Sequence, residues 1–119
     1  SSNNITNDSQ ALGVALNNSA SSATIQINNL FLNENTGEYG KVTAFDATGK
    51  ELNSFVFGNG SGTNGSAVAS HFGSEFVAVN YFTGSDNQGS FTITSAMAGG
   101  DFSYLVFIGM PYGAGVISQ

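Results

Sequence analysis

The chain has 119 residues, of which 40% are hydrophobic and only 8% are charged; two Lys, no Arg and eight acidic residues give a net charge of −6. A domain of this length buries a core without cross-links, and there is no Cys to form disulfides, thiolate metal sites or redox pairs. Two lysines cannot form a basic patch and no run of about 18 apolar residues exists, which excludes nucleic-acid binding, anionic lipid binding and membrane insertion.

The polar residues indicate an extracellular protein. They are mainly Ser, Thr, Asn and Gly, whereas cytosolic domains usually keep themselves soluble with charge. The chain also begins at Ser1 without an initiator Met, as a mature product does after its signal peptide is removed. We therefore expect a secreted or cell-surface protein.

Residues 1–22 form a Ser/Asn-rich N-terminal arm with one apolar stretch. In that stretch, Ala11 to Leu16, the side chains of Leu12, Val14 and Leu16 alternate and therefore point to one face of a strand. The arm is thus a candidate assembly strand, and residues 23–119 form the body of the domain.

The body contains many strand signals and few helix signals. Stretches rich in aromatic and β-branched residues, separated by Gly- and Asn-containing turns, are Thr24–Ile27, Lys41–Ala44, Phe55–Phe57, Phe76–Phe82, Phe91–Thr94 and Phe102–Ile108. The clearest local feature is a hairpin over Val42–Leu52, in which Asp46 accepts backbone hydrogen bonds and Gly49 takes the left-handed position. These signals predict an all-β fold: an antiparallel β-sandwich of about eight or nine strands, jelly-roll-like, with an apolar layer of Phe between the sheets.

Two segments differ from this pattern. Gly58 to Gly65 is rich in glycine but lacks the Lys-Ser/Thr signature of a phosphate-binding loop, so we expect a plain loop with no helix after it. Ala69–Phe72 is expected to be a strand in which Ser70 and Phe72 share one face and His71 points to the other.

The sequence contains no recognisable catalytic device. His71 is the single histidine, and no Gly-x-Ser-x-Gly elbow accompanies it. No pair of acids is set across a cleft as glycoside hydrolysis requires, since Glu34 and Glu38 belong to one turn. We therefore expect a protein that is not an enzyme.

No cofactor is indicated, with calcium as the one ion to consider. Calcium binds carboxylate, amide and carbonyl oxygens in loops, which Glu34, Glu38, Asp86 and Asp101 can supply. The alternative is that these four residues are ordinary solvated turn residues.

Aromatic residues for sugar recognition are few. Sugar-binding modules commonly stack rings on Trp and Tyr, and this chain has no Trp and four Tyr. Tyr81 and Tyr104 lie within apolar strands, which leaves Tyr39 and Tyr112 as the candidate sugar-binding residues.

Asn-x-Ser/Thr sequons are in mild excess over chance. They occur at Asn4, Asn7, Asn17, Asn59 and Asn64, which are the candidate glycosylation sites. Glycans at these positions would replace the missing surface charge in keeping the protein soluble.

The apolar strand in the arm, Ala11, Leu12, Val14 and Leu16, has two possible positions. It closes either the protein's own sheet or the sheet of a neighbouring copy. In the second case it satisfies the edge hydrogen bonds of the neighbour and buries alternate side chains there, and the contact propagates head to tail.

In overall plan the chain resembles the subunits of secreted filaments assembled by donor-strand complementation, such as archaeal threads and bundling pili. The shared features are the Ser/Asn-rich arm with Ala11 to Leu16, the low-charge jelly-roll-like body and the sequons. This resemblance implies that residues 10–17 enter a groove of the neighbouring subunit. Separately, the hairpin Val42 to Leu52 is similar to hairpins of secreted bacterial jelly-roll modules, some of which bind carbohydrate.

Our leading expectation is a non-enzymatic extracellular structural protein that assembles with itself into a filament or surface layer. The alternative is a carbohydrate-binding or adhesion module, with or without calcium. A viral capsid or decoration protein of the same fold also remains open, and the size of the native particle distinguishes fibre, shell and monomer.

Overall fold

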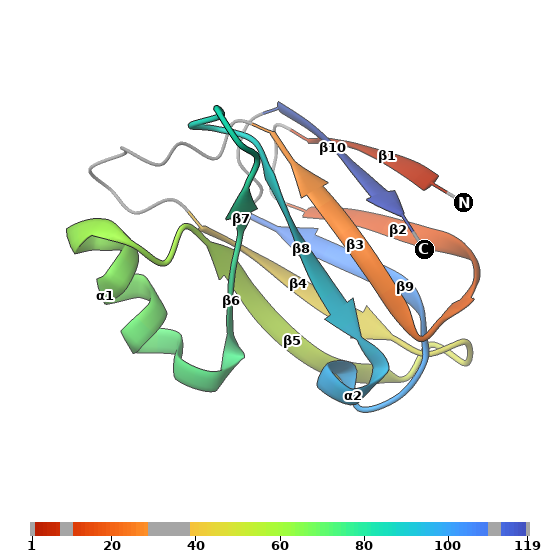
Figure 1. The fold of residues 1–119 in the computed structure, drawn as a ribbon. Coiled ribbons are helices and arrows are strands. Elements are labelled where there is room, and N and C mark those ends of the chain that lie inside the picture. Colours follow the sequence, from red (N-terminus) through yellow and green to blue (C-terminus); the bar gives the residue numbers. More distant parts are fainter. Residues whose placement is uncertain (1, 8–10, 29–38, 110–112, 119) are drawn as a thin grey trace.

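The computed structural model of the protein describes residues 2–7, 11–28, 39–109 and 113–118, with the backbone alone described for 2–7, 11 and 113–118. In these residues ten strands form two five-stranded sheets that pack face to face (Figure 1). Sheet 1 has the order β1-β10-β3-β8-β7, and sheet 2 has the order β2-β9-β4-β5-β6. The predicted β-sandwich is therefore confirmed.

The elements follow the chain in two groups separated by a helical crossover. The strands before the crossover are β1 (Ser2–Asn7), β2 (Ala11–Ala20), β3 (Ser22–Ile27), β4 (Tyr39–Phe45) and β5 (Glu51–Gly58). The helix α1 (Gly62–Phe72) and the 3₁₀ turn η1 (Gly73–Glu75) come next. The remaining elements are β6 (Phe76–Ala78), β7 (Asn80–Tyr81), β8 (Gly89–Thr94), α2 (Ser95–Ala98), β9 (Phe102–Ile108) and β10 (Gly113–Ser118).

The strand pairs are nested along the chain. The first strand β1 pairs with the last strand β10, then β2 pairs with β9, β3 with β8, and β4 with β5. All four pairs are antiparallel, and successive pairs belong alternately to sheet 1 and sheet 2. The one departure from the expected antiparallel order is β6, which runs parallel to β5 because the helical crossover through α1 lies between them.

Aromatic rings join the two sheets at the centre of the core. Phe57 of sheet 2 stacks on Phe91 of sheet 1, with ring centroids 4.7 Å apart and an interplanar angle of 18°. The Phe107 ring meets Phe57 edge-on at 6.5 Å, and all three side chains are fully buried. Phe fills this layer without leaving a polar group that needs a partner.

The predicted hairpin between β4 and β5 is present. The Asp46 carboxylate accepts hydrogen bonds from the Thr48 hydroxyl at 2.7 Å and from the backbone N–H groups of Thr48 and Lys50, each at 2.9 Å. These bonds, the one from the Thr48 hydroxyl first, hold the pKa of the Asp46 carboxyl below its ordinary value. Gly49 has φ of +88°, the left-handed conformation that the turn requires.

Two expectations for the middle of the chain are wrong, because a helix lies there. The glycine-rich segment is a loop only as far as Ser61, and α1 runs from Gly62 through Ala69–Phe72, the residues predicted as a strand. Packing overrides the poor helix propensity of this segment. Gly65 is buried against the loop, since a Cβ there would lie 3.3 Å from the Gly60 nitrogen, and the Phe72 ring packs against Tyr39.

The predicted strand Phe76–Phe82 is divided between the two sheets. β6 belongs to sheet 2 and β7 to sheet 1, and the buried residue Val79 lies at the crossing, where its N–H donates to the Gly58 carbonyl at 2.8 Å. The strand β8 approaches this crossing closely, because a Cβ on Gly89 would lie 2.5 Å from the Asn80 carbonyl oxygen. The short helix α2, which the sequence did not indicate, is capped by the Thr94 hydroxyl.

Candidate functional site

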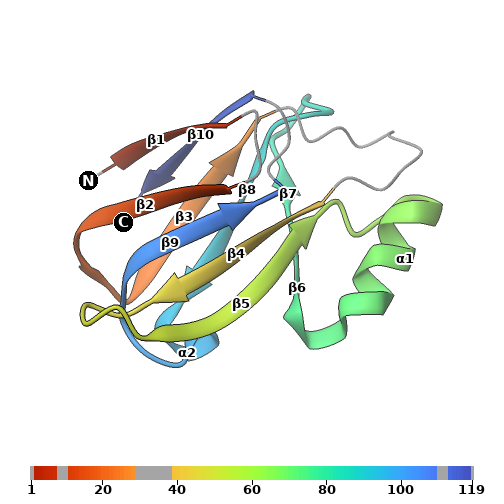
Figure 2. The ribbon, with the colours of Figure 1, turned by 180° about the vertical axis from the view of Figure 1, so that it is seen from behind.

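The N-terminal segment supplies the outer strand of both sheets on one side of the sandwich. β1 is the outer strand of sheet 1 beside β10, and β2 is the outer strand of sheet 2 beside β9 (Figure 2). These strands are six and ten residues long and carry no charged side chain. An edge strand presents a row of backbone N–H and C=O groups that another chain can bind.

The opposite edge strands are short, and charged residues lie beside the edge of sheet 2. β7 has two residues, and the three-residue β6 covers only Val56–Gly58 of β5. The uncovered part of β5 contains a β-bulge next to its pair Phe45–Glu51, and Lys41, Glu51 and Glu75 line a polar depression there. Short strands, bulges and charges are the features by which proteins prevent edge pairing. The N-terminal side is therefore the candidate assembly edge.

The predicted assembly residues all lie in β2. Leu12 and Val14 are half-buried against the core and pair with Phe107 and Leu105 of β9, while Leu16 is buried. The backbone of Ala11 pairs with Ile108. In this single chain the strand thus lies in its own sheet, and its transfer to a neighbouring copy stays a prediction.

β2 leaves the register of β9 halfway along its length. Ala15 pairs with Tyr104 and the next pair is Ala20 with Phe102, so five steps along β2 (20 − 15) match two steps along β9 (104 − 102). Asn17, Asn18 and Ser19, which lie in this interval, are exposed. The first half of β2 is therefore joined to the rest of the body by a stretch that is not paired with β9.

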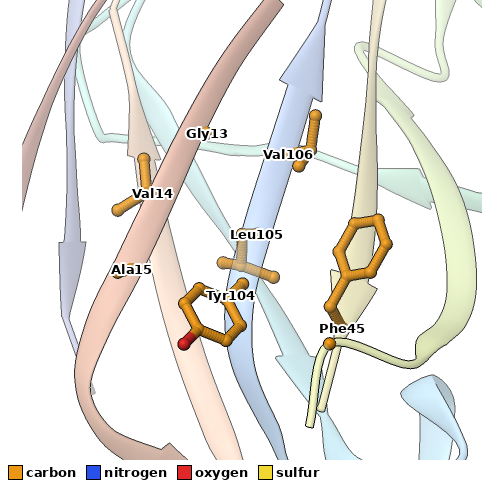
Figure 3. A pocket seen from close by; sticks show the side chains of 8 residues that line it. Gly13, Val14, Ala15, Phe45, Tyr104, Leu105 and Val106 are labelled. Carbon is orange, nitrogen blue, oxygen red and sulfur yellow. The ribbon is translucent and has the colours of Figure 1, made fainter. Parts of the chain in front are cut away.

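The outer face of sheet 2 carries an apolar hollow beside the same edge. Its lining includes Gly13 and Ala15 of β2, Tyr104 and Val106 of β9, and Phe45 of β4 (Figure 3). Ile108 lies on the same face beside Lys41 and is 46% exposed, and Tyr104 is 43% exposed. Tyr104 was expected inside an apolar strand, so sequence reasoning missed it as a surface residue.

Tyr39, one of the two sugar-binding candidates, is exposed. Its side chain is 47% exposed, and its ring packs against Phe72 of α1 with centroids 5.4 Å apart. The other candidate, Tyr112, lies outside the described residues. Among the residues that can be placed, Tyr39 is thus the one sugar-binding candidate.

The calcium candidates are not brought together by the residues that can be placed. Glu34 and Glu38 lie outside the described residues, and Asp86 and Asp101 are exposed in separate turns. Within residues 2–7, 11–28, 39–109 and 113–118, no three His, Cys, Asp or Glu side chains form a group that could hold a metal ion.

The five sequons have different structural settings. Asn4 and Asn7 belong to β1, Asn17 is exposed in β2, and Asn64 is exposed in α1. Asn59 is half-buried in the loop before α1, where its amide nitrogen donates to the Ser61 carbonyl at 3.2 Å and its amide oxygen accepts the Ser61 hydroxyl at 2.8 Å.

His71 lies near the end of α1. Its imidazole is exposed and meets the Phe72 ring edge-on, with centroids 4.8 Å apart. The described contact of His71 is thus a packing contact with the neighbouring ring on the helix surface.

Comparison with known proteins gives no relative, since no family model, no curated protein and no solved structure matches the chain. Among the described residues, none of the helices is long and apolar enough to cross a membrane.

Proposed function

We propose that this protein is a non-enzymatic extracellular structural protein, a self-assembling filament or surface-layer subunit whose copies are joined by β-strand complementation. The observation that carries the proposal is that one N-terminal segment forms the edges of both sheets on the same side of the sandwich. At the opposite side, the described edge of sheet 2 has a short strand, a bulge and nearby charges, and the outer strand of sheet 1 has two residues.

The nested strand order supports a jelly roll as the finer description of the sandwich. A jelly roll has eight strands in two sheets, arranged as two Greek keys. The nested pairs β1·β10, β2·β9, β3·β8 and β4·β5 supply eight such strands, with alternate pairs in alternate sheets. β6 and β7 are then short additions along the edge far from the N-terminus.

Strand exchange follows from this arrangement. If residues 1–15 leave their own sheets, β10 and β9 lose their outer neighbours on the same side of the molecule. The same segment of a second copy restores the same backbone pairs, and it places the second copy's Leu12 and Val14 against Phe107 and Leu105. Each copy then gives one arm and receives another, and the contact propagates into a filament when the giving and the receiving neighbours are different copies.

An engineered disulfide tests this exchange, because the chain has no Cys of its own. Gly13 of β2 pairs with Val106 of β9, and paired strand residues lie within the Cα separation that a disulfide bridges. The double variant Gly13→Cys/Val106→Cys is oxidised as assembled protein and run on a denaturing gel without reductant. Exchange predicts a ladder of covalently linked subunits.

The control places the disulfide within the body. Thr24 and Thr92 pair between β3 and β8, so Thr24→Cys/Thr92→Cys must give a cross-linked monomer in either case. A monomer from the Gly13/Val106 variant in assembled material would refute the exchange of the arm. Deleting residues 1–20 is expected to leave a soluble, less stable monomer, and Val14→Asp is expected to block assembly where a change at Ser2 does not.

A second function, a carbohydrate-binding or adhesion module, is favoured by the exposed tyrosines. The side chains of Tyr39 and Tyr104 present aromatic rings on the outer face of sheet 2, to which the flat side of a sugar can stack. A glycan array with Tyr39→Ala and Tyr104→Ala controls, with and without calcium, tests it. Absence of binding in both conditions would exclude this function.

A further inference from the structure

The hollow on the outer face of sheet 2 is not covered by the part of the chain that the structure describes. Phe45 and Tyr104 pair directly across β4 and β9, and the small residues Gly13 and Ala15 lie beside them on β2. Nothing lies within 4 Å of the position that a Cβ on Gly13 would occupy. The hollow is lined almost entirely by apolar surface.

A sequon begins two residues beyond this hollow along the same strand. Ala15 lines the hollow and pairs with Tyr104, and Asn17-Asn18-Ser19 follows in the exposed stretch that has left the register of β9. A sugar attached to Asn17 would therefore start at the rim of the hollow.

The backbone distinguishes Asn17 from the sequons at Asn59 and Asn64. In extended backbone, residues two apart tend to point to the same side, which brings the amide and the hydroxyl of a sequon together, whereas in a helix they are about 200° apart. Asn17 and Ser19 are both in β2, while Asn64 and Ser66 are both in α1.

Asn59 is committed to a structural role instead. Both polar atoms of its side chain bond to Ser61, and Gly65 packs against it, since a Cβ on Gly65 would lie 3.4 Å from the Asn59 amide nitrogen. A glycan on that nitrogen would displace the first turn of α1. The Asn59 side chain therefore holds the loop that begins the helix.

We propose that Asn17 carries an N-linked glycan whose first sugars lie over the hollow and stack on the Tyr104 ring. The sugar comes from a lipid-diphosphate-linked oligosaccharide and is attached by an oligosaccharyltransferase. The Asn17 amide nitrogen forms a bond to the anomeric carbon, the bond from that carbon to the diphosphate oxygen breaks, the nitrogen loses one proton, and the lipid diphosphate leaves.

Chemistry and position both support this occupant. A pyranose ring has a face of C–H groups that packs on an aromatic ring, while its hydroxyls stay in water, so it covers an open apolar surface without burying polar groups. Asn17 belongs to the N-terminal arm but lies beyond residues 1–15, the part that the proposed exchange moves, so the glycan stays with the body whether or not strands are exchanged. This inference rests on the extracellular location in the proposed function and not on the proposed assembly.

Peptide mapping by mass spectrometry of the full chain, secreted from a host with this transferase, locates the sugar. We expect Asn17 to be occupied and Asn59 to be unmodified. Ser19→Thr should keep the glycan and Ser19→Ala should lose it. An unmodified Asn17, or a glycan on Asn59 in the folded protein, would overturn the assignment.

A coupling experiment tests where the sugar lies. Enzymatic removal of the glycan should expose the hollow and increase the fluorescence of a dye that binds apolar surface. Tyr104→Ala should lower Tm by about 3 °C more in the glycosylated protein than in the Asn17→Gln variant, a difference typical of about one weak contact in a domain of this size.

The matched control for this experiment is Tyr39→Ala. Tyr39 has a similar exposure but packs against Phe72 of α1. Figure 1 shows α1 and β2 on opposite sides of the sandwich. The effect of Tyr39→Ala on Tm should be the same with and without the glycan. Equal effects for Tyr104→Ala in both forms would show that the sugar does not contact the hollow.

Discussion

Replacing Gly40 by alanine should destabilise the protein, although alanine is normally the better residue in a strand. Gly40 lies opposite Phe57 in the pairing of β4 with β5, and the Phe57 ring lies over it. A Cβ at Gly40 would be 2.5 Å from the tip of that ring, well inside van der Waals contact. The ring cannot easily withdraw, because it is fully buried, stacked on Phe91 and in edge contact with Phe107.

Two opposing terms set the size of the effect. Exchange of glycine for alanine inside a strand stabilises by about 0.5–1 kcal/mol, through the reduced freedom of the unfolded chain. Inserting a methyl group into a tightly packed core costs about 1–3 kcal/mol. The overpacking term is larger, so the free energy of unfolding should fall by about 1–2 kcal/mol, and Tm by about 5 °C for each kcal/mol.

Urea unfolding measures this change through the midpoint and the slope m. The midpoint should fall while m stays constant, because the variant alters the native core and not the surface exposed on unfolding. The control is Gly13→Ala, whose Cβ meets nothing within 4 Å, so it should be neutral or stabilising. If Gly40→Ala were as stable as Gly13→Ala, the packing of Phe57 over Gly40 would be wrong.

Two further predictions concern the hairpin turn and the core. Asp46 has a folded-state pKa below its ordinary value, so its contribution to stability is present above the unfolded-state pKa and is lost as the pH falls through the folded-state pKa. Unfolding measured from pH 7 down to pH 2 should therefore show a smaller loss of stability for Asp46→Asn than for the wild type. Ile93→Ala should cost about 2–5 kcal/mol because Ile93 is fully buried, whereas Ile108→Ala, at a residue 46% exposed, should cost less than half as much, and similar costs would contradict the assignment of β9's outer face.

The parts of the fold that the sequence predicts well are those set by local interactions. The hairpin between β4 and β5 depends on Asp46 and Gly49, both within the turn itself, and its hydrogen bonds are found where expected. The strand order is different, because β1 pairs with β10 across the whole chain and no local signal encodes such a pairing.

The helix α1 shows how long-range packing defeats a local prediction. Its sequence is rich in Gly, Ser, Thr and Asn, which are poor helix formers. Its stabilising contacts lie outside the helix, where Gly65 fits against the Asn59–Gly60 loop and Phe72 packs on Tyr39 of β4. The helix could therefore be predicted only if the positions of the preceding loop and of β4 were already known.

The outer face of β9 was missed for a related reason. Phe102–Ile108 is an almost continuous apolar run, which the sequence alone cannot divide into inward and outward residues. In the structure Leu105 and Phe107 enter the core, while Tyr104 and Ile108 face outward. The available signal was Tyr104 itself, since its phenol hydroxyl needs a polar partner or water.

Because the strand pairs are nested, the N-terminal arm covers the edges of both sheets at once. β1 pairs only with β10, which lies between β1 and β3, so removing β1 leaves the last strand of the chain as the new edge of sheet 1. Removing the first half of β2 exposes β9 at the same side of sheet 2. One continuous segment therefore opens both sheets together, and only a segment with the same spacing of paired residues closes both of them. A second copy of the chain has that spacing by identity, which supports the proposed self-assembly over capture of an unrelated partner.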